Sequence, residues 1–328
     1  MVVYLKKDDK IHYLSGHVVP QVGNLFVDML TMTLDIPEED HAKTMAGFQK
    51  TKESGDGKPF SKTAYSHNLK LSSENEADIL IHCKPTIAKQ TGNKYRFFRI
   101  EFNPSKANLD NLKKNIDLIL PGGYAKLMKD GIVTRIDLAV DALYLDATDI
   151  VASHPKIKVE KHYAHNGVIE TKYLGAPSSS KQIVLYDKLA EIKHRNSKKG
   201  KAFKIPVPGE KIFRIEHRFF KLGCTLKDVA SLPNPFTDLT LIAYPGSKST
   251  KSQDPLWTLF LSACRFEGVP TALNHLNAER QEEFKKRLDT EGRSDWWKPE
   301  AVWQGLPLAI NKIISVKGYL PSLPSLKS

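Results

Sequence analysis

Apolar and polar residues alternate along several stretches of the chain, and this alternation predicts β-strands. A strand turns successive side chains to opposite faces, so a period of two marks one buried face and one polar face. The pattern occurs at residues 24–33, 78–83, 95–102, 133–141, 171–175, 181–187 and 212–220. These stretches predict an antiparallel sheet within the part of the chain that ends near residue 222.

Apolar residues recur at helical spacing in three other stretches. The first is 106–119, whose shared apolar face consists of Leu109, Leu112, Ile116 and Ile119. In the second, 254–266, Asp254 is placed to cap the helix and Pro255 to occupy its first position. The third stretch is 271–290. Each of the three is expected to form one helix.

Two polar stretches, 40–75 and 194–211, are expected to be loops. The predicted strands, helices and loops together indicate an α+β fold. The expected organisation is an antiparallel β-sheet domain with flanking helices over residues 1–222. A mainly helical C-terminal region follows over residues 223–328. We find no internal repeat.

Composition and charge narrow the class of partner. The chain has 328 residues, of which 41% are hydrophobic and 26% are charged, as is typical of a globular protein. Its formal net charge is +12, from 49 Lys and Arg against 37 Asp and Glu. An excess of cations favours a polyanionic partner, because neutralised phosphates release their condensed counterions.

Several classes of protein are not expected from this sequence. No run of 18 or more apolar residues is present, and the first residues lack a signal-peptide pattern. The cysteines Cys83, Cys224 and Cys264 are scattered and form no CxxC pair. We therefore expect a cytoplasmic protein that does not contact membranes and has no structural zinc site.

Carboxylates cluster by strand face in a way that suggests chemistry. In 133–141, Asp137 and Asp141 point away from the apolar face, and Glu216 does the same in 212–220. Glu101 occupies the equivalent face of 95–102. If the three strands belong to one sheet, their carboxylates suit Mg²⁺ or Mn²⁺, which prefer oxygen ligands. The alternative is a solvated face held by cross-strand ion pairs.

Tyr186 stands at the end of an apolar strand, with Lys188 two positions later. A phenol titrates at about pH 10, so it attacks a phosphodiester only with help in losing its proton and a cation on the phosphate. A Tyr-x-Lys pair beside carboxylate-bound metal would supply these parts. The alternative is a tyrosine that packs in the core with a hydrogen-bonded hydroxyl.

Four motifs follow one another over about residues 95–220. They are FRIEFNPSK at 98–106, TRIDLAVD at 134–141, HNGVIETKYLGAPSSSKQIVLYDK at 165–188 and FRIEHRF at 213–219. In order and spacing they resemble the trans-acting rolling-circle replication initiators of small plasmids, the replication initiation factor family. More distantly, they are similar to the nicking initiators of filamentous phages. Residues outside this range match only loosely.

The resemblance implies roles for particular residues. The nucleophile of the family falls on Tyr186 and its motif lysine on Lys188. The acidic strand residues of the family fall on Glu101, Asp137, Asp141 and Glu216, of which three are expected to hold Mg²⁺ or Mn²⁺. Tyr173 also lies in a family motif and is the competing nucleophile.

The activity implied by the resemblance is site-specific DNA nicking. Residues 1–222 would form the nicking domain, and 223–328 would recognise the origin as a duplex or as a hairpin with a single-stranded nick site. Attack by the tyrosine would leave a 5′-phosphotyrosine and a 3′-hydroxyl that primes synthesis. No GxxxxGK[ST] loop is present. The absence of this loop is consistent with reliance on a separate helicase. The resemblance implies that this partner is a host superfamily-1 helicase and that the protein acts as a homodimer.

Basic residues after the tyrosine motif are candidates for contacts with the DNA backbone, the alternative being a solvated loop. They are Lys193, Arg195, Lys198, Lys199, Lys201 and Lys204. Three histidines are candidate metal ligands. His82 has Lys84 rather than a second histidine two residues later and is interpreted as structural, and the Asn-Gly that follows His162 and His165 indicates a turn rather than a helix. The tryptophans at 296, 297 and 303 are expected to pack in the C-terminal region.

Two other functions compete with nicking. One is a non-enzymatic origin-binding or regulatory protein that uses the same basic surface, with the carboxylates in ion pairs only. The other is a conjugative relaxase, which normally has an N-terminal nucleophile and a histidine triad. Neither feature is present in this sequence.

Overall fold

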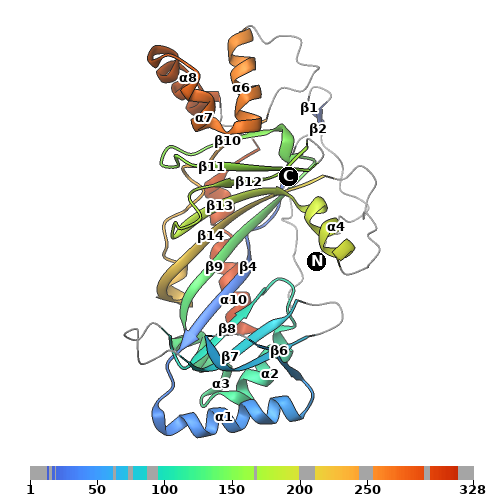
Figure 1. Cartoon of the computed structure of the whole chain (residues 1–328), viewed down its shortest axis with the longest axis vertical. Helices are drawn as coiled ribbons and strands as arrows, with labels where there is room; N and C mark the ends of the chain where they lie inside the picture. The colour runs from blue at the N-terminus through green and yellow to red at the C-terminus, as the bar shows by residue number, and fades with distance from the viewer. Residues whose placement is uncertain are drawn as a thin grey trace, which may run out of the picture.

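The computed structural model describes residues 13–14, 17–18, 20–61, 64–72, 77–86, 95–165, 168–198, 211–243, 254–291 and 296–316. It has an α+β fold, as expected, built on one large sheet in which every described pairing is antiparallel. Figure 1 shows an elongated molecule, with the sheet running along its length and helices at both ends.

The main sheet has eleven strands among the described residues. In spatial order ten of them are β11 (Glu160–His165), β12 (Val168–Leu174), β13 (Lys181–Asp187), β14 (Ile212–Thr225), β9 (Ile132–Leu143), β4 (Phe26–Leu34), β8 (Phe98–Phe102), β7 (Ile79–Pro85), β6 (Tyr65–Leu71) and β5 (Gly57–Pro59), and β3 (Gln21–Val22) pairs with β9. Two small sheets pair β1 (Tyr13–Leu14) with β2 (His17–Val18), and β10 (Ile150–Ser153) with β15 (Thr240–Ala243). All seven predicted strands are present.

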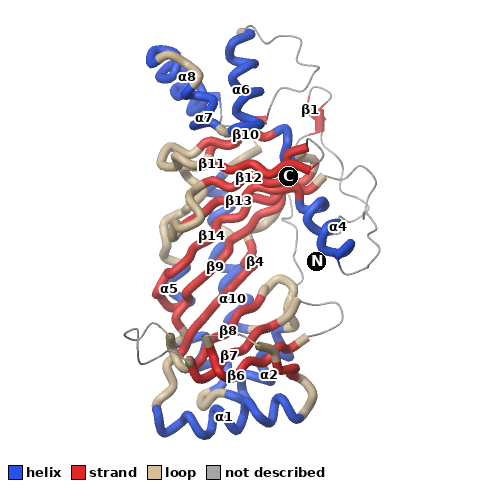
Figure 2. Tube along the Cα trace, in the orientation of Figure 1, coloured by secondary structure: helices blue, strands red, loops and turns tan. Residues whose placement is uncertain are grey.

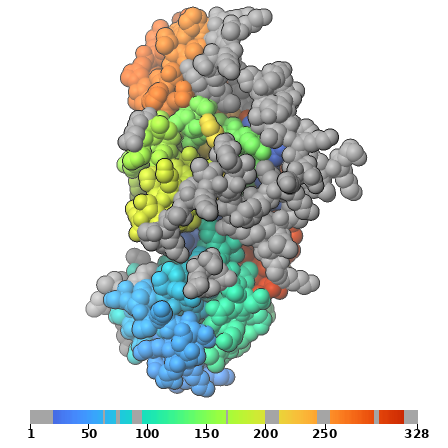
Figure 3. All heavy atoms as spheres, turned by 90° about the vertical axis from the view of Figure 1, so that its right-hand side faces the viewer, coloured from blue at the N-terminus to red at the C-terminus, as the bar shows by residue number. Residues whose placement is uncertain are grey.

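Helices gather at the two ends of the sheet and on one of its faces (Figures 1 and 2). One end carries α1 (Glu38–Glu53), α2 (Leu109–Ile119) and α3 (Gly123–Asp130); the other carries α6 (Pro255–Glu267), α7 (Val269–Asn274) and α8 (Ala278–Glu291). The remaining helical segments are η1 (Ala147–Asp149), α4 (Lys188–Lys198), α5 (Leu226–Val229), α9 (Pro299–Trp303) and α10 (Leu306–Ser315). In the space-filling view, residues of α1 and of α6–α8 lie at opposite poles (Figure 3).

A single large core joins the apolar face of the sheet to these helices. Leu138, Leu185 and Ile215 come from neighbouring strands, and each is fully buried there. From the helices, Leu112 of α2 and Ile310 of α10 belong to the same cluster. Burial of that face against helices leaves the opposite, polar face of the central strands free for chemistry.

Two predicted helices are confirmed and one is corrected. The helix predicted at 106–119 is α2, and that at 254–266 is α6, where the side chain of Asp254 caps the helix and Pro255 begins it. The single helix predicted at 271–290 is wrong. The chain forms α7 and then α8, because Asn277 accepts a hydrogen bond from the backbone of Arg280 and starts a new helix.

The loop predicted at 40–75 is also wrong, because this stretch contains most of α1 and all of β5 and β6. The buried face of α1 consists of Thr44, Gly47, Phe48 and Thr51, which give almost no apolar periodicity. A Cβ at Gly47 would lie 2.3 Å from the carbonyl oxygen of Leu118, so glycine permits α1 to lie directly against α2. In the other predicted loop, 194–198 are helical and 199–210 lie outside the described residues.

The end of the chain continues the same fold. Strand β14 passes residue 222 and ends at Thr225, and Phe236 lies in the main core with Trp297. The indole of Trp297 donates a hydrogen bond to the backbone of Leu239, and Trp303 lies edge-on to Phe236, so the tryptophans pack as predicted. A functional division at residue 222 stays a prediction. Among the described helices, none is long and apolar enough to cross a membrane.

Candidate active site

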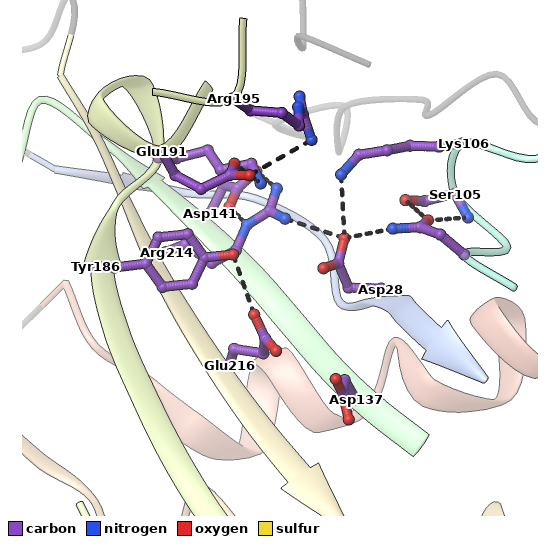
Figure 4. A network of polar contacts seen from close by, with 12 residues as sticks. Asp28, Ser105, Lys106, Asp137, Asp141, Tyr186, Glu191, Arg195, Arg214 and Glu216 are labelled. Atoms are coloured by element: carbon purple, nitrogen blue, oxygen red, sulfur yellow. Dashed lines mark hydrogen bonds and ion pairs between the residues drawn. The ribbon is translucent and has the colours of Figure 1, made fainter. Parts of the chain in front are cut away.

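The four predicted carboxylates lie on one face of the main sheet, and Tyr186 lies on the same face. The strand register places Tyr186 on β13, Arg214 on β14 and Asp141 on β9 side by side. Further along, Glu216 and Asp137 point the same way. Figure 4 shows Tyr186, Arg214, Asp141 and Glu216 gathered over the central strands, with Asp137 further along. The two-residue alternation therefore identified the correct face of each strand.

The hydroxyl of Tyr186 donates a hydrogen bond to Oε2 of Glu216 over 3.0 Å (Figure 4). Both residues are buried, Tyr186 with 8% and Glu216 with 2% of its surface exposed. Burial raises the pKa of Tyr186 well above its ordinary value, against the opposing charge of Arg214, and the carboxylate of Glu216 adds to the rise. The phenol is therefore protonated, and its proton points at a potential base.

Arg214 is the central cation of this face. Its guanidinium, 4% exposed, contacts Asp141 through Nε at 2.6 Å and Nη2 at 2.7 Å. Through Nη1 it also reaches Oδ1 of Asp28 at 3.1 Å. Two-point contact with a carboxylate fixes the orientation of the guanidinium. A rigid positive charge thus lies next to the phenol of Tyr186.

Asp28, which sequence reasoning left without a role, pairs with Arg214 because of a β-bulge. The register between β4 and β9 shifts between Val27 and Met29, so Asp28 is an extra residue in its strand. Burial would raise the pKa of Asp28, but Arg214, Lys106 and Lys188 lower it far below the ordinary value. Asp28 is therefore ionised. No alternation pattern reveals a bulge, so sequence alone could not place it.

The FNPSK segment after β8 supplies further partners of Asp28. The amide of Asn103 donates to Asp28 over 3.0 Å, and Nζ of Lys106 lies 3.6 Å away. The backbone and the hydroxyl of Ser105 both donate to Asn103, which fixes its side chain (Figure 4). The signal available in the sequence was the motif itself, whose polar residues follow a strand end.

Asp137 and Glu216 are held by arginines on the same face. Arg218 lies 2.7 Å from Oε1 of Glu216 and 3.8 Å from Oδ2 of Asp137, and Arg135 donates two hydrogen bonds to Asp137. Burial raises the pKa of Asp137 to about 6; Arg135 opposes this rise and the neighbouring charge of Glu216 adds to it. The two acids are thus neighbours on this face, and each is paired with an arginine.

Lys188 begins helix α4 and does not continue the strand of Tyr186. Its Nζ lies 5.5 Å from the centre of the Tyr186 ring and 2.7 Å from Oε2 of Glu191. Burial, with the nearby charges of Arg214 and Lys106, lowers the pKa of Lys188 to about 8. An amine with such a pKa can give and take a proton near neutral pH.

Glu101 lies apart from the other acids. Strand β4 separates its strand from β9, which corresponds to about 10 Å at the usual strand spacing. Glu101 accepts one hydrogen bond from Nε of Arg99 at 3.2 Å and is in contact with Nε2 of His82 at 3.1 Å. His82 is fully buried, and its Nδ1 lies 2.7 Å from Oδ1 of Asn68. Sequence alternation could not reveal the intervening strand.

Asp137 and Glu216 offer oxygen ligands to a divalent ion. Burial, with a smaller contribution from the charge of Glu216, raises the pKa of Asp137, and a cation between the two acids would oppose this rise. Arg218 already contributes positive charge at that place. In the described part of the chain, no three His, Cys, Asp or Glu side chains form a complete metal site. Mg²⁺ commonly uses one or two carboxylates together with substrate phosphates and water. Both oxygens of Asp137 accept hydrogen bonds from Arg135, and Oε1 of Glu216 accepts one from Arg218, so an ion at this place would compete with these arginines.

Among the predicted DNA-contacting residues, Lys193, Arg195 and Lys198 lie exposed on α4, and Arg195 pairs with Glu191 at 3.4 Å. Lys199, Lys201 and Lys204 lie outside the described residues. Tyr173, the competing nucleophile, is on the same face as Tyr186 but one strand further out, on β12.

The other two candidate histidine ligands, His162 and His165, both lie on strand β11 and not on a helix. His162 contacts Glu160 and the backbone of Phe266, whereas His165 lies edge-on to His194.

Comparison with known proteins relates part of this chain to replication proteins. It is 39% identical over 102 residues to a replication initiation protein from Staphylococcus aureus, which is 30% of each chain. A second replication initiation protein from the same species is 34% identical over 125 residues, 37% of this chain and 35% of the relative. The chain therefore matches these curated relatives over about a third of their length.

Other comparisons add little. No family model matches the chain. A solved structure of the rolling circle replication initiator protein from Geobacillus stearothermophilus aligns with 75% of this chain and 98% of that one. The sequence identity is 13% and the TM-score 0.33, which is too low to show a shared fold.

Proposed function

We propose that this protein initiates rolling-circle replication by nicking one strand of an origin, with Tyr186 as the nucleophile. The observation that carries the proposal is the hydrogen bond from the phenol of Tyr186 to the carboxylate of Glu216, beside the fixed charge of Arg214. The relationship to replication initiation proteins supports DNA at an origin as the substrate.

The proposed step is a transesterification. The oxygen of Tyr186 forms a bond to the scissile phosphorus while the bond from phosphorus to the 3′-oxygen breaks, which leaves a 5′-phosphotyrosine. Glu216 takes the phenol proton, and Lys188 is placed to protonate the departing 3′-oxygen. The resulting 3′-hydroxyl primes synthesis. Positive charge from Arg214 and Lys106 near the phosphate stabilises the charge that develops there.

The proposal includes a divalent ion, Mg²⁺ or Mn²⁺, held by Asp137 and Glu216 with Asp141 as a further candidate. The two oxygens of Glu216 already face different partners, Oε2 toward Tyr186 and Oε1 toward Arg218. One carboxylate could thus serve both the phenol and an ion. When bound, the ion would polarise the scissile phosphate. Glu101 is the predicted ligand that the strand order separates from the rest.

Contacts outside the nicking site are proposed from the same relationship. The exposed cations of α4 would follow the DNA backbone, and the region after residue 222 would recognise the origin as a duplex or hairpin. A host superfamily-1 helicase would unwind the nicked template. The initiator would act as a homodimer.

The test is a nicking assay on supercoiled plasmid that carries the origin of the encoding replicon, with Mn²⁺ or with EDTA. Wild type should give nicked circles covalently bound to protein with Mn²⁺ only. Tyr186→Phe should lose at least about 10³-fold in rate, because it removes the nucleophile and leaves the ring in place. Tyr173→Phe is the matched control and should nick normally. Equal nicking by Tyr186→Phe and wild type would refute the assignment.

A non-enzymatic origin-binding protein is the second candidate, and one observation favours it. Arg214, Arg218 and Arg135 already neutralise the acids around Tyr186, so this polar face is electrostatically satisfied without metal or substrate. On this reading, origin DNA is bound and never cleaved. Specific retention of origin duplex by wild type, with no nicked or covalent product in Mn²⁺, would identify it.

A further inference from the structure

Two tyrosines, one exposed and one half-buried, form an aromatic pair near the edge of the main sheet. Tyr163 of β11 and Tyr173 of β12 meet edge to face, with ring centres 5.5 Å apart and an angle of 80° between their planes. Tyr163 is 56% exposed, although an aromatic ring of this size is usually more buried. The exposure of Tyr163 is a cost to the isolated protein that a stacked ligand would remove.

The pair lies on the same face as the proposed nucleophile. Thr171 of β12 is the register partner of both Tyr163 and Tyr186. Two strand spacings, about 10 Å, therefore separate Tyr163 from Tyr186. A continuous series of contacts joins the pair to the nucleophile. The guanidinium of Arg218 lies 6.0 Å from the centre of the Tyr173 ring and 2.7 Å from Glu216, which accepts the hydrogen bond of Tyr186.

Charge around the pair is suited to nucleic acid. Lys161 is the register partner of Tyr173 and is exposed on the same strand face as Tyr163. Arg218 borders Tyr173 on its other side. Proteins that bind single strands combine aromatic faces for the bases with cations for the phosphates, and both are present here. A duplex keeps its bases stacked inside and could not use such rings.

We propose that Tyr163 and Tyr173 form a stacking platform for the bases of single-stranded DNA next to the scissile phosphate. The platform holds an extruded strand along the polar face, so that one phosphodiester reaches Tyr186. The choice of DNA as ligand rests on the proposed function. The stacking itself is independent of cleavage and of any metal.

The experiment measures binding of a fluorescently labelled dT₁₂ oligonucleotide and of a 12-base-pair duplex by anisotropy, in EDTA. The full chain with Tyr186→Phe is used throughout, so nicking plays no part. Tyr163→Ala should weaken binding of the single strand about 5- to 150-fold, because one stacked base is lost. Tyr163→Phe keeps a ring and should bind as the parent does. Duplex affinity should be unchanged in both variants.

The matched control is Phe266→Ala on α6, which removes a ring that is 59% exposed; the backbone of Phe266 contacts His162, whose side chain lies on the face of β11 opposite Tyr163. It should leave dT₁₂ binding unchanged. The slope of affinity against salt should also be the same for Tyr163→Ala and the parent, because no phosphate contact is removed.

Three results would overturn the platform. One is unchanged dT₁₂ binding by Tyr163→Ala; another is an equal loss for single strand and duplex. The third is a difference in sedimentation between Tyr163→Ala and its parent without DNA, which would show that the tyrosines form an interface between copies of the chain. Failure of nicking by wild type, with dT₁₂ binding lost only in Tyr163→Ala, would refute the proposed function and leave the platform standing.

Discussion

The two faces of the central strands differ in almost every physical respect, although their residues alternate along the same segments of chain. On β13 and β14, Tyr186, Arg214 and Glu216 form a buried polar network. The next residues along the same strands, Leu185 and Ile215, are fully buried in the apolar core. Backbone geometry alone separates them, since successive side chains point in opposite directions.

This difference shows that the role of a residue in these strands depends on which face of the sheet it points to, more than on its position along the strand. The polar face contains groups whose pKa values are shifted by burial and by one another, as at Tyr186, Asp137 and Lys188. Such shifts are common where proton transfer occurs. The core face contributes mainly apolar burial. Substitutions one residue apart should therefore separate activity from stability.

The largest expected effect is on the polar face. Glu216→Gln keeps the shape of the side chain and removes the base that accepts the phenol proton. Nicking should fall about 10²- to 10⁴-fold, while affinity for origin duplex is retained. Glu101→Gln is the matched control, because Glu101 lies on the same face beyond β4, and it should change the rate by less than about threefold. The measurement is the nicking rate of each variant and of wild type at saturating Mn²⁺. Equal losses in the two variants would mean that Glu101 takes part in the site.

A core-face substitution next to the nucleophile should do the opposite. Leu185→Ala opens a cavity in the main core, because the residue is fully buried, and should destabilise the fold by about 2–5 kcal/mol. Nicking per folded molecule should stay within a few-fold of wild type. Urea denaturation gives the free energy of unfolding, and a nicking assay at the same temperature gives the rate per folded molecule. The comparison of faces breaks down if stability is unchanged and nicking is lost.

The smallest expected effect concerns His217, a titratable group on the core face. It is 4% exposed, and burial, with the nearby charges of Lys181 and His154, lowers its pKa to about 3. Between that value and about 6.5, the unfolded chain binds a proton that the folded chain does not. Stability from the neutral ring is therefore complete above about pH 6.5 and falls as pH drops below it.

The measurement is the free energy of unfolding at pH 7 and at pH 5, for wild type and His217→Leu. Wild type should lose about 1–2 kcal/mol more than the variant on acidification. An identical pH dependence in the two proteins would show that folding does not change the pKa of His217.

Alternation and helical periodicity predicted the elements that face one large core. The sequences of β9 and β14 alternate apolar and charged residues, and α2 has an apolar stripe. Helix α1 could not be found in this way, since Gly47 and two threonines form most of its buried face. Its packing depends on close approach to the backbone of α2, which is a tertiary property.

The sequence predicted which strand faces carry the candidate site, but not the order of the strands or the contacts between the side chains. Parity placed Asp137, Asp141 and Glu216 on the face of Tyr186, because each strand is regular there. Strand order is not written in any one strand, so the separation of Glu101 was not foreseen. The roles of Arg214 and Asp28 depend on contacts between residues 186 positions apart in sequence.

The bulge at Asp28 makes strand β4 unusually tolerant of a change in its length. Because Asp28 is the surplus residue, Phe26 and Met29 already occupy successive positions on one face of the strand. A chain lacking this single residue would keep all later side chains of β4 on their present faces, whereas a deletion elsewhere in the strand would invert them. Evolution could therefore gain or lose the second carboxylate of Arg214 in one codon, without refolding the sheet.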